Sequence, residues 1–257
     1  MARARVPLSR RVLRTILRRL ERAYGPPPPP RRLPPLDELV LTILSQHTSD
    51  VNRDRAYADL RRRFATWDEV ADAPAPAIAS AVRRGGLGAT KAQRIKAVLR
   101  ELRRGGALGD STLRGSSAEE TWRRLRELPG VGPKTAACVL LFSLDEPYFP
   151  VDTHVHRVAK RLGLVPERAT AAQAQEILQA VVPPEAVYEL HMQLIRHGRA
   201  ICRAPRPLCE ECPLLDICPR IGLSRIAGRR DAGARLARLA RRDPLRRTGP
   251  QASARRR

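Results

Sequence analysis

The sequence contains few aromatic residues, far fewer acidic than basic residues, and no long apolar run. Aromatic side chains make up 4% of its 257 residues, so a hydrophobic core must be built mainly from Leu, Val, Ile and Ala. The longest apolar run covers residues 136–142, far short of the ~20 residues that a membrane-spanning helix needs. The first 30 residues hold no apolar segment that ends in a small-residue cleavage site. We therefore expect neither a membrane protein nor a secreted one.

Cysteine is scarce as well, and it is unevenly distributed. Four of the five cysteines lie between positions 202 and 218. An odd number of cysteines, crowded into one segment, argues against the disulfide framework of a secreted protein. We expect a reducing, cytoplasmic setting.

Arginine is what the chain has in excess. The formal net charge is +23, and 45 of the 49 basic residues are arginine. Residues 1–35 carry ten arginines against one acid, and residues 220–257 carry thirteen against two. Such a surplus attracts polyanions, most commonly nucleic acid, and basic ends bind phosphates without reading sequence. The sequence thus predicts a nucleic-acid partner and an Arg-rich tail over residues 223–257, which is either disordered or bound to phosphates.

Hydrophobic periodicity predicts helices along the chain. Apolar residues between positions 12 and 20 recur every three or four residues, as on one face of an amphipathic helix that ends near Tyr24. A proline run at 26–30 then forms a stiff connector. Further helical patterns, separated by Pro and Gly, cover residues 36–46, 50–64 and 89–104. Sustained alternation of β-branched residues is missing, so we predict an all-α fold.

Residues 128–136, LPGVGPKTA, have the pattern of a helix-hairpin-helix. A capping box of Ser117 and Glu120 predicts the helix before them, and the proline suits the first turn of the helix after them. Gly130 and Gly132 allow positive φ and leave room for an approaching backbone. The amide groups of such a hairpin can cradle a DNA phosphate. The residues expected to contact DNA here are Gly130, Val131, Gly132 and Thr135.

Lys134 lies in the first turn of the second helix of this hairpin. The positive end of the helix dipole disfavours its ammonium form, which makes the neutral amine a plausible Schiff-base nucleophile. A lysine at this position can equally serve as a simple phosphate contact. The local sequence leaves both roles open.

Asp152 stands just before a helical stretch and is a natural N-cap. Such a carboxylate stays ionised, and beside a cleft it could stabilise oxocarbenium charge or help to activate an amine. A purely capping role is the alternative. His154 and His156 are two residues apart and point in different directions on a helix, so we expect core packing or phosphate contacts rather than a metal pair.

The four clustered cysteines follow the spacing C-x6-C-x2-C-x5-C, which is typical of a metal centre. Four thiolates on one loop can enclose either Zn²⁺ or an iron–sulfur cluster, and the spacing alone does not choose. No position is left open for a substrate, so we expect a structural role. The predicted ligands are Cys202, Cys209, Cys212 and Cys218. The fifth cysteine, Cys138, is expected in the core.

These motifs, in this order, resemble the endonuclease III family of the helix-hairpin-helix glycosylase superfamily. LPGVGPKTA is similar to the family's hairpin, VDTHVHRV to its catalytic-aspartate segment, and HGRAIC to the run into its cluster; GLGATKAQRI fits a further segment. The likeness covers about residues 10–219. It implies an all-α, two-lobed fold with a six-helix barrel and an iron–sulfur lobe. The implied parts are a basic N-terminal helix (1–30) packed with the cluster lobe, the barrel (31–146, hairpin at about 118–144), the cluster lobe (147–222) and the tail (223–257).

The resemblance also implies an activity. Lys134 becomes the Schiff-base lysine, Asp152 the catalytic carboxylate, and the four cysteines the ligands of a [4Fe–4S] cluster. The implied enzyme is a monomeric, nucleoid-associated DNA N-glycosylase and apurinic/apyrimidinic lyase. It acts on double-stranded DNA that carries a flipped-out damaged base or an abasic site, with oxidised pyrimidines as the leading substrates.

The segment LSQHTSD at 44–50 departs from the family, because many bacterial members carry a Ser-Ala-Gln run there. In the family, this segment helps to fill the gap left by the flipped base. Gln46 and His47 are therefore expected to contact DNA, with ordinary helix-end polar groups as the alternative. Lys91, in the segment GLGATKAQRI, is a further expected DNA contact.

Two alternatives use the same motifs differently. A monofunctional glycosylase uses water as its nucleophile and needs an upstream catalytic Glu, but Leu41 stands where it would fall and Glu38 is three residues away. A non-catalytic DNA-binding module with a structural metal is disfavoured because Lys134 and Asp152 are both present. Covalent trapping on abasic DNA would separate all three.

Overall fold

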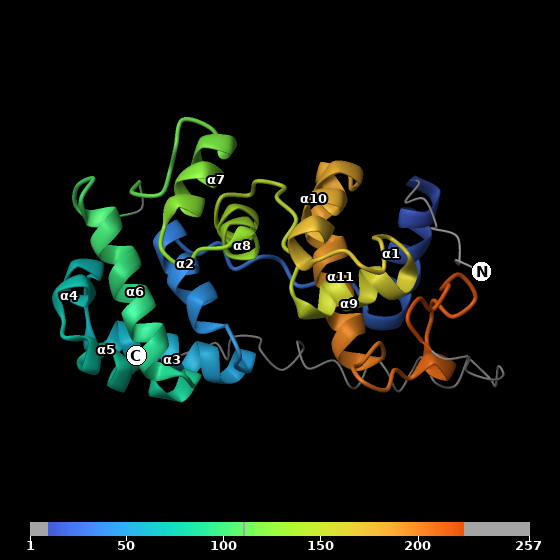
Figure 1. Cartoon of the computed structure of the whole chain (residues 1–257), viewed down its shortest axis with the longest axis horizontal. Coiled ribbons are helices and arrows are strands. Elements are labelled where there is room, and N and C mark those ends of the chain that lie inside the picture. The colour runs from blue at the N-terminus through green and yellow to red at the C-terminus, as the bar shows by residue number, and fades with distance from the viewer. Residues whose placement is uncertain (1–9, 110, 224–257) are drawn as a thin grey trace, which may run out of the picture. The chain divides into compact units, whose positions relative to one another are not determined.

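The computed structural model describes residues 10–109 and 111–223, which form helices joined by turns and loops, with no strand among them (Figure 1). The all-α prediction is confirmed. None of the described helices is both long enough and apolar enough to cross a membrane. The first nine residues and almost all of the predicted Arg-rich tail, residues 224–257, lie outside the described residues.

The chain divides into two compact units. The hairpin unit is Pro30–Pro150, which contains the LPGVGPKTA run. The terminal unit combines Met1–Pro29 with Val151–Arg257, so it is built from both ends of the chain.

The hairpin unit is organised around a buried helix. Its helices are α2 (Pro35–Leu44), α3 (Asp50–Arg63), α4 (Trp67–Asp72), α5 (Ala75–Ala81), the short 3-10 helix η1 (Arg83–Gly85), α6 (Gly88–Arg103), α7 (Ala118–Glu127) and α8 (Pro133–Ser143). Nearly every residue of α2 is buried, and this helix packs against α8, α3 and α6. The predicted helices at 36–46, 50–64 and 89–104 correspond to α2, α3 and α6, with ends within two residues.

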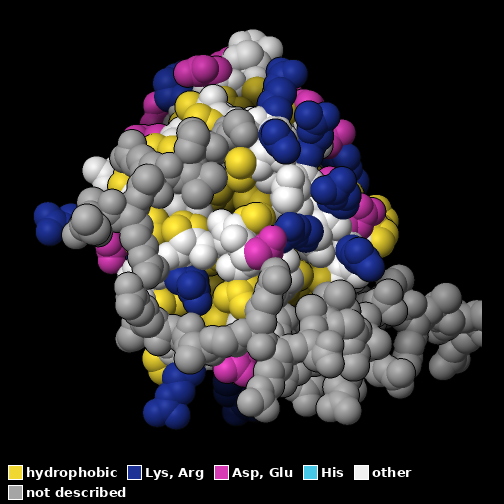
Figure 2. Space-filling model, turned by 90° about the vertical axis from the view of Figure 1, so that its right-hand side faces the viewer, with side chains coloured by type: hydrophobic (Ala, Val, Ile, Leu, Met, Phe, Trp, Pro, Cys, Tyr) yellow, Lys and Arg dark blue, Asp and Glu magenta, His cyan; other side chains and the backbone are white. Residues whose placement is uncertain are grey.

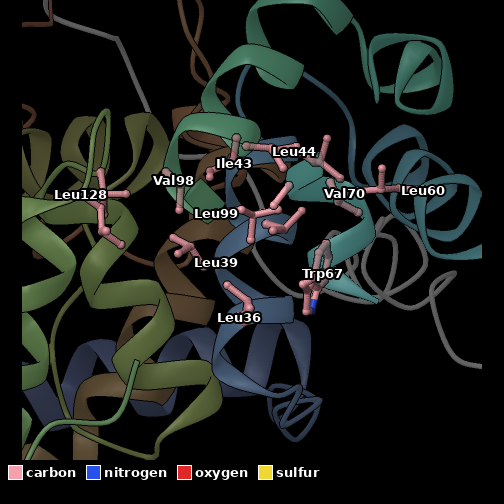
Figure 3. Packing of buried hydrophobic residues seen from close by; sticks show 14 of the residues in the cluster. Leu36, Leu39, Ile43, Leu44, Leu60, Trp67, Val70, Val98, Leu99 and Leu128 are labelled. Atoms are coloured by element: carbon pink, nitrogen blue, oxygen red, sulfur yellow. The ribbon is translucent and has the colours of Figure 1, made fainter. Parts of the chain in front are cut away.

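Leucine, isoleucine and valine build the core of this unit, as the shortage of aromatics predicted (Figure 3). Leu39 and Ile43 of α2 are fully buried, and Val98 and Leu99 of α6 lie in the same cluster. Each fully buried side chain of this kind contributes about 1.5–3 kcal/mol from the removal of apolar surface from water. The packing fixes the end of α2, where the 44–50 segment begins.

Side-chain caps set where several helices begin. Ser117 accepts a 3.1 Å hydrogen bond from the Glu120 amide and so caps α7 as predicted. The reciprocal half of the predicted capping box differs, because the Glu120 carboxylate accepts from the Ser116 amide at 2.8 Å. Pro133 occupies the first turn of α8, as predicted.

The terminal unit joins distant parts of the sequence. Its helices are α1 (Arg10–Tyr24), α9 (Thr153–Leu162), α10 (Ala171–Val181) and α11 (Val187–Ala200), with the 3-10 helices η2 (Pro184–Ala186) and η3 (Cys209–Glu211). The helix α11 packs against both α1 and α9. Its Arg196 donates hydrogen bonds to the carbonyl oxygens of Tyr24 (2.6 Å) and Gly25 (2.9 Å), which holds the end of α1 as predicted near Tyr24.

In Figure 2, Lys and Arg side chains gather along one side of the visible face, with Asp and Glu side chains among them.

Candidate active site

The hairpin between α7 and α8 combines a buried anchor with an open backbone. Leu128 and Val131 are 6% and 5% exposed, and the Val131 amide donates to the Leu128 carbonyl oxygen at 3.1 Å. Gly130 takes a φ of +75°, which a side chain rarely tolerates. Gly132 has an ordinary φ of −88°, contrary to the expected freedom of both glycines, and a Cβ built there would meet nothing within 4 Å. The open space beside Gly132 suits close approach of another backbone.

The two other hairpin residues expected to contact DNA can do so through their backbone rather than through their side chains. The side chains of Val131 and Thr135 are buried; Val131 lies in the turn before α8, and Thr135 lies in the first turn of that helix. The amides at the N-terminus of α8 carry the positive end of the helix dipole, which favours an anion there.

Lys134 is the second residue of α8 and is half-buried. The carboxyl group of Glu38, on the neighbouring helix α2, lies within electrostatic reach of it. Burial raises the pKa of Glu38 to about 7, while the positive charges of Arg53, Lys134 and Arg31 act in the opposite direction. From the sequence alone, Glu38 is weighed only as the catalytic Glu of a monofunctional glycosylase and set aside, because it lies three residues from the expected position. The sequence feature that could have pointed to a buried carboxyl is an acidic residue inside the largely apolar run LDELVLTIL.

Gln46 and His47 lie in the turn that follows α2. The amide N–H of Gln46 donates to the Ile43 carbonyl oxygen at 3.3 Å, and His47 has a φ of +53°. The side-chain oxygen of Gln46 accepts a hydrogen bond from Nη1 of Arg94 on α6. The Gln46 side chain is thus fixed by a residue of another helix, whereas an ordinary polar group at a helix end needs no such partner.

Lys91 is directed into the unit. Its ammonium donates to the carbonyl oxygens of Leu44 at 2.8 Å and Gly85 at 2.7 Å, and the residue is 3% exposed. Burial lowers the pKa of the Lys91 amine. These contacts give Lys91 a structural role, because they tie the end of α2 to the segment before α6. Direct contact between Lys91 and DNA stays a prediction.

Leu87 is a residue that sequence reasoning did not single out. It is 59% exposed and has a left-handed backbone with a φ of +50°, immediately before α6. A large apolar side chain held out of the core at an uncommon backbone conformation needs a reason. Wedging between stacked bases is one use of such a side chain. Its signal in the sequence was a leucine between two glycines, in the run GGLG.

Asp152 belongs to the terminal unit and caps α9, as predicted. Its Oδ1 accepts a 2.7 Å hydrogen bond from the Val155 amide. The neighbouring His154 is partly buried; burial lowers its pKa, which the negative charge of Asp152 opposes. The ring nitrogen Nδ1 of His154 lies 3.1 Å from Nη2 of Arg157, and Nε2 of His156 lies 2.8 Å from the carbonyl oxygen of Ala169. The two histidines therefore have different hydrogen-bond partners.

The four clustered cysteines line one cavity of the terminal unit, together with Arg161 and His197. All four are free thiols, and burial raises the pKa values of Cys209, Cys212 and Cys218, that of Cys218 to about 11. Two of the sulfurs have N–H donors nearby: Arg161 Nη1 lies 3.4 Å from the sulfur of Cys202, and the Leu214 amide lies 3.4 Å from that of Cys212. In residues 10–109 and 111–223, no group of three or more His, Cys, Asp or Glu side chains is arranged closely enough to hold a single metal ion. The predicted core position of Cys138 is confirmed, since it is 3% exposed.

Comparison with known proteins gives this arrangement a family. Residues 40–184 match the family model of the HhH-GPD superfamily base excision DNA repair proteins. A putative DNA glycosylase of Arabidopsis thaliana is 39% identical over 191 residues, which are 73% of this chain and 65% of that protein. Endonuclease III of Thermotoga maritima is 36% identical over 186 residues, which are 72% of this chain and 82% of that protein.

Solved structures agree with the sequence comparison. A trapped endonuclease III–DNA covalent intermediate has a TM-score of 0.70 and 26% identity, over 83% of this chain and 97% of that one. A non-covalent endonuclease III–DNA complex has a TM-score of 0.70 and 27% identity, over 83% and 96%. The chain belongs to the HhH-GPD superfamily of base excision DNA repair proteins. Within it, the chain is an endonuclease III-like DNA glycosylase, which confirms the resemblance read from the motifs.

Proposed function

We propose that the chain is a bifunctional DNA glycosylase and apurinic/apyrimidinic lyase, with Lys134 as its nucleophile and Asp152 as its catalytic carboxylate. The observation that carries the proposal is the position of Lys134, a half-buried amine in the first turn of α8, two residues after the open backbone of Gly132. A phosphate bound at that backbone would bring a nucleotide close to the amine. We propose that the hairpin unit, with its helices around α2, corresponds to the family's six-helix barrel. The terminal unit, with its four clustered cysteines, is proposed to correspond to the family's iron–sulfur lobe.

The proposed reaction begins on a nucleotide whose base has left the helix stack. The neutral Lys134 amine attacks C1′, the bond from C1′ to the base breaks, and the base leaves with the electron pair and takes a proton from solvent. Asp152 opposes the positive charge that develops on the sugar and accepts the proton that the amine loses. Asp152 returns that proton to O4′ as the C1′–O4′ bond of the resulting aminal breaks, which opens the sugar ring and leaves a protonated imine between Nζ and C1′. This imine acidifies the hydrogens on C2′. Loss of one of them expels the 3′ phosphate by β-elimination.

Gln46, His47 and Leu87 are proposed to occupy the gap in the duplex. Gln46 is held by Arg94, and Leu87 is exposed just before α6, the helix that carries Arg94. An apolar wedge beside a polar side chain can replace the stacking and the hydrogen bonds of the extruded base. We propose oxidised pyrimidines in duplex DNA as substrates, with the chain acting as a monomer in the cytoplasm, as part of the nucleoid.

The cysteine segment is proposed to hold a [4Fe–4S] cluster through Cys202, Cys209, Cys212 and Cys218. Four reduced, largely desolvated thiols around one cavity, with an arginine donor on Cys202, fit such a group. When bound, the cluster stabilises the thiolate forms and ties the loop after α11 to the rest of its unit. Purified protein should then be brown and contain iron and sulfide in equal amounts. Cys212→Ala should lose the colour, and a colourless protein with stoichiometric zinc would contradict the assignment.

Borohydride trapping tests the catalytic proposal. Abasic-site DNA with borohydride should yield a covalent adduct with the native chain and none with Lys134→Gln, although that variant still binds DNA. Lys160→Gln, on α9, is the matched control and should trap normally. Asp152→Asn keeps a side-chain oxygen to cap α9, so its stability should hold while base release slows. Normal strand cleavage by Lys134→Gln, or base release without any adduct, would instead indicate a monofunctional glycosylase.

A further inference from the structure

Arg94 connects two segments of the hairpin unit that are far apart in sequence. Its Nη1 donates to the side-chain oxygen of Gln46, in the turn after α2. Its stem lies against the hairpin: a Cβ built on Gly130 would be 2.7 Å from Arg94 Nε and 3.1 Å from its Cδ. The space that a side chain at position 130 would need is therefore occupied by Arg94. One arginine contacts both the proposed gap-filling turn and the proposed phosphate cradle.

The same helix fixes the Gln46 turn a second time. Lys91, one turn before Arg94 on α6, donates to the carbonyl oxygen of Leu44, two residues before Gln46. The backbone of the turn is thus anchored by Lys91 and its side chain by Arg94. This arrangement leaves Gln46 little freedom to rotate.

The chemistry of arginine decides which end of the Gln46 amide faces outward. A guanidinium group has five N–H donors and no acceptor, so it must face the amide oxygen rather than the amide nitrogen. With its oxygen bound to Arg94, Gln46 has its NH₂ group left to offer to a ligand. A partner recognised by this group must carry a hydrogen-bond acceptor.

We propose that Arg94 is a positioning residue that orients Gln46 as a hydrogen-bond donor toward the unpaired base opposite the lesion and couples it to the hairpin. The inference rests on the proposed function, because it assumes that the Gln46 turn meets the gap in the duplex. It adds a source of specificity to that function, because the Gln46 side-chain amide, in the orientation that Arg94 fixes, donates a hydrogen bond to acceptor atoms of the unpaired base. The hairpin and the Gln46 turn then engage a damaged duplex together.

Binding to DNA that cannot react tests the proposal. The measured quantity is the ratio of two affinities, one for a duplex with a tetrahydrofuran abasic analogue and one for the undamaged duplex. Arg94→Ala and Gln46→Ala should each lower this ratio about tenfold, and the double variant should lower it no further, because the two side chains act as a unit. Arg94→Lys keeps a donor and should recover part of the ratio.

Two further variants separate this role from charge and from packing. Gln46→Glu keeps an acceptor for Arg94 but has no donor for DNA, so it should lower the ratio as Gln46→Ala does. Arg100→Ala removes a charge from an exposed position on the same helix and should weaken both affinities alike, leaving the ratio unchanged. Additive effects of Arg94→Ala and Gln46→Ala, or an unchanged ratio in Arg94→Ala or in Gln46→Glu, would overturn the proposal. At saturating enzyme, the borohydride adduct should still form with every Arg94 variant; its absence from the native chain would defeat the proposed function instead.

Discussion

The carboxyl group of Glu38 accepts a 3.0 Å hydrogen bond from the hydroxyl of Thr42, one turn further along α2. Both residues are buried, at 8% and 4% exposure. An ionised carboxylate loses its hydration when it is buried, and a single hydrogen bond from a neutral hydroxyl does not make up for that loss. Burial therefore outweighs the hydrogen bond and the nearby positive charges, and it raises the pKa of Glu38 to about 7. The folded state therefore binds a proton that the unfolded chain releases at lower pH.

Glu38→Gln should change how stability depends on pH. The folded pKa lies above the ordinary value of 4.5, so the free energy of unfolding of the native chain should fall as pH rises from 4.5 to 7 and level off above that. The difference amounts to at most about 3 kcal/mol. The glutamine stays neutral and removes this slope, so the variant should be the more stable protein at pH 8 and nearly equal at pH 5.

Urea unfolding at pH 5 and pH 8, at one ionic strength, measures this prediction. Glu101→Gln, at a surface ion pair with Arg104, is the control and should keep the native slope. Parallel pH profiles for the native chain and Glu38→Gln would show that Glu38 does not titrate in this range.

Lys91→Met should destabilise the hairpin unit. The methionine keeps most of the stem but leaves the buried carbonyl oxygens of Leu44 and Gly85 without their donor. Each unpaired buried acceptor costs about 1–3 kcal/mol, so the loss for the two carbonyl oxygens should be roughly 2–6 kcal/mol. Lys96→Met is the comparison on the same helix, because the Lys96 ammonium bonds a carbonyl oxygen at a less buried position. A smaller loss from Lys91→Met than from Lys96→Met in thermal unfolding would count against the buried contact.

Alanine at Gly130 and at Gly132 should separate folding from DNA binding. Gly130→Ala places a Cβ against Arg94 at a φ of +75°, so both thermal stability and DNA affinity should fall. Gly132→Ala meets open space at an ordinary φ, so its stability should equal that of the native chain. Its new methyl group nevertheless occupies the proposed phosphate position, and DNA affinity should drop. Unchanged affinity in Gly132→Ala would place the phosphate elsewhere.

Leu87→Ala should leave the fold intact and impair extrusion of a base. The side chain is 59% exposed, so its removal forms no cavity in the core. A fluorescent base analogue placed beside an abasic site reports unstacking, and its signal on binding should be much weaker with the variant. Val181→Ala, at an exposed position in the terminal unit, is a control that should keep the native signal. An equal signal from both variants would rule out the wedge.

Local patterns carried much of what the sequence could predict. The N-cap roles of Ser117 and Asp152 and the helix start at Pro133 depend on groups within three or four residues, and the structure has each of them. The cysteine spacing likewise brought four thiols to one cavity. Gly132 shows the limit of this reasoning, because residue type permits a positive φ without requiring it.

The sequence by itself determined the all-α fold, the hairpin and its lysine, the capping aspartate and the cysteine set, because each depends on short-range periodicity and spacing. The tertiary structure decided what Glu38, Lys91, Arg94 and Gln46 do. The burial of Glu38, the hydrogen bonds of Lys91 to two carbonyl oxygens, and the position of Arg94 between the Gln46 turn and Gly130 all depend on the packing of helices against one another. Such contacts depend on which faces pack together, and no local pattern of residues specifies that.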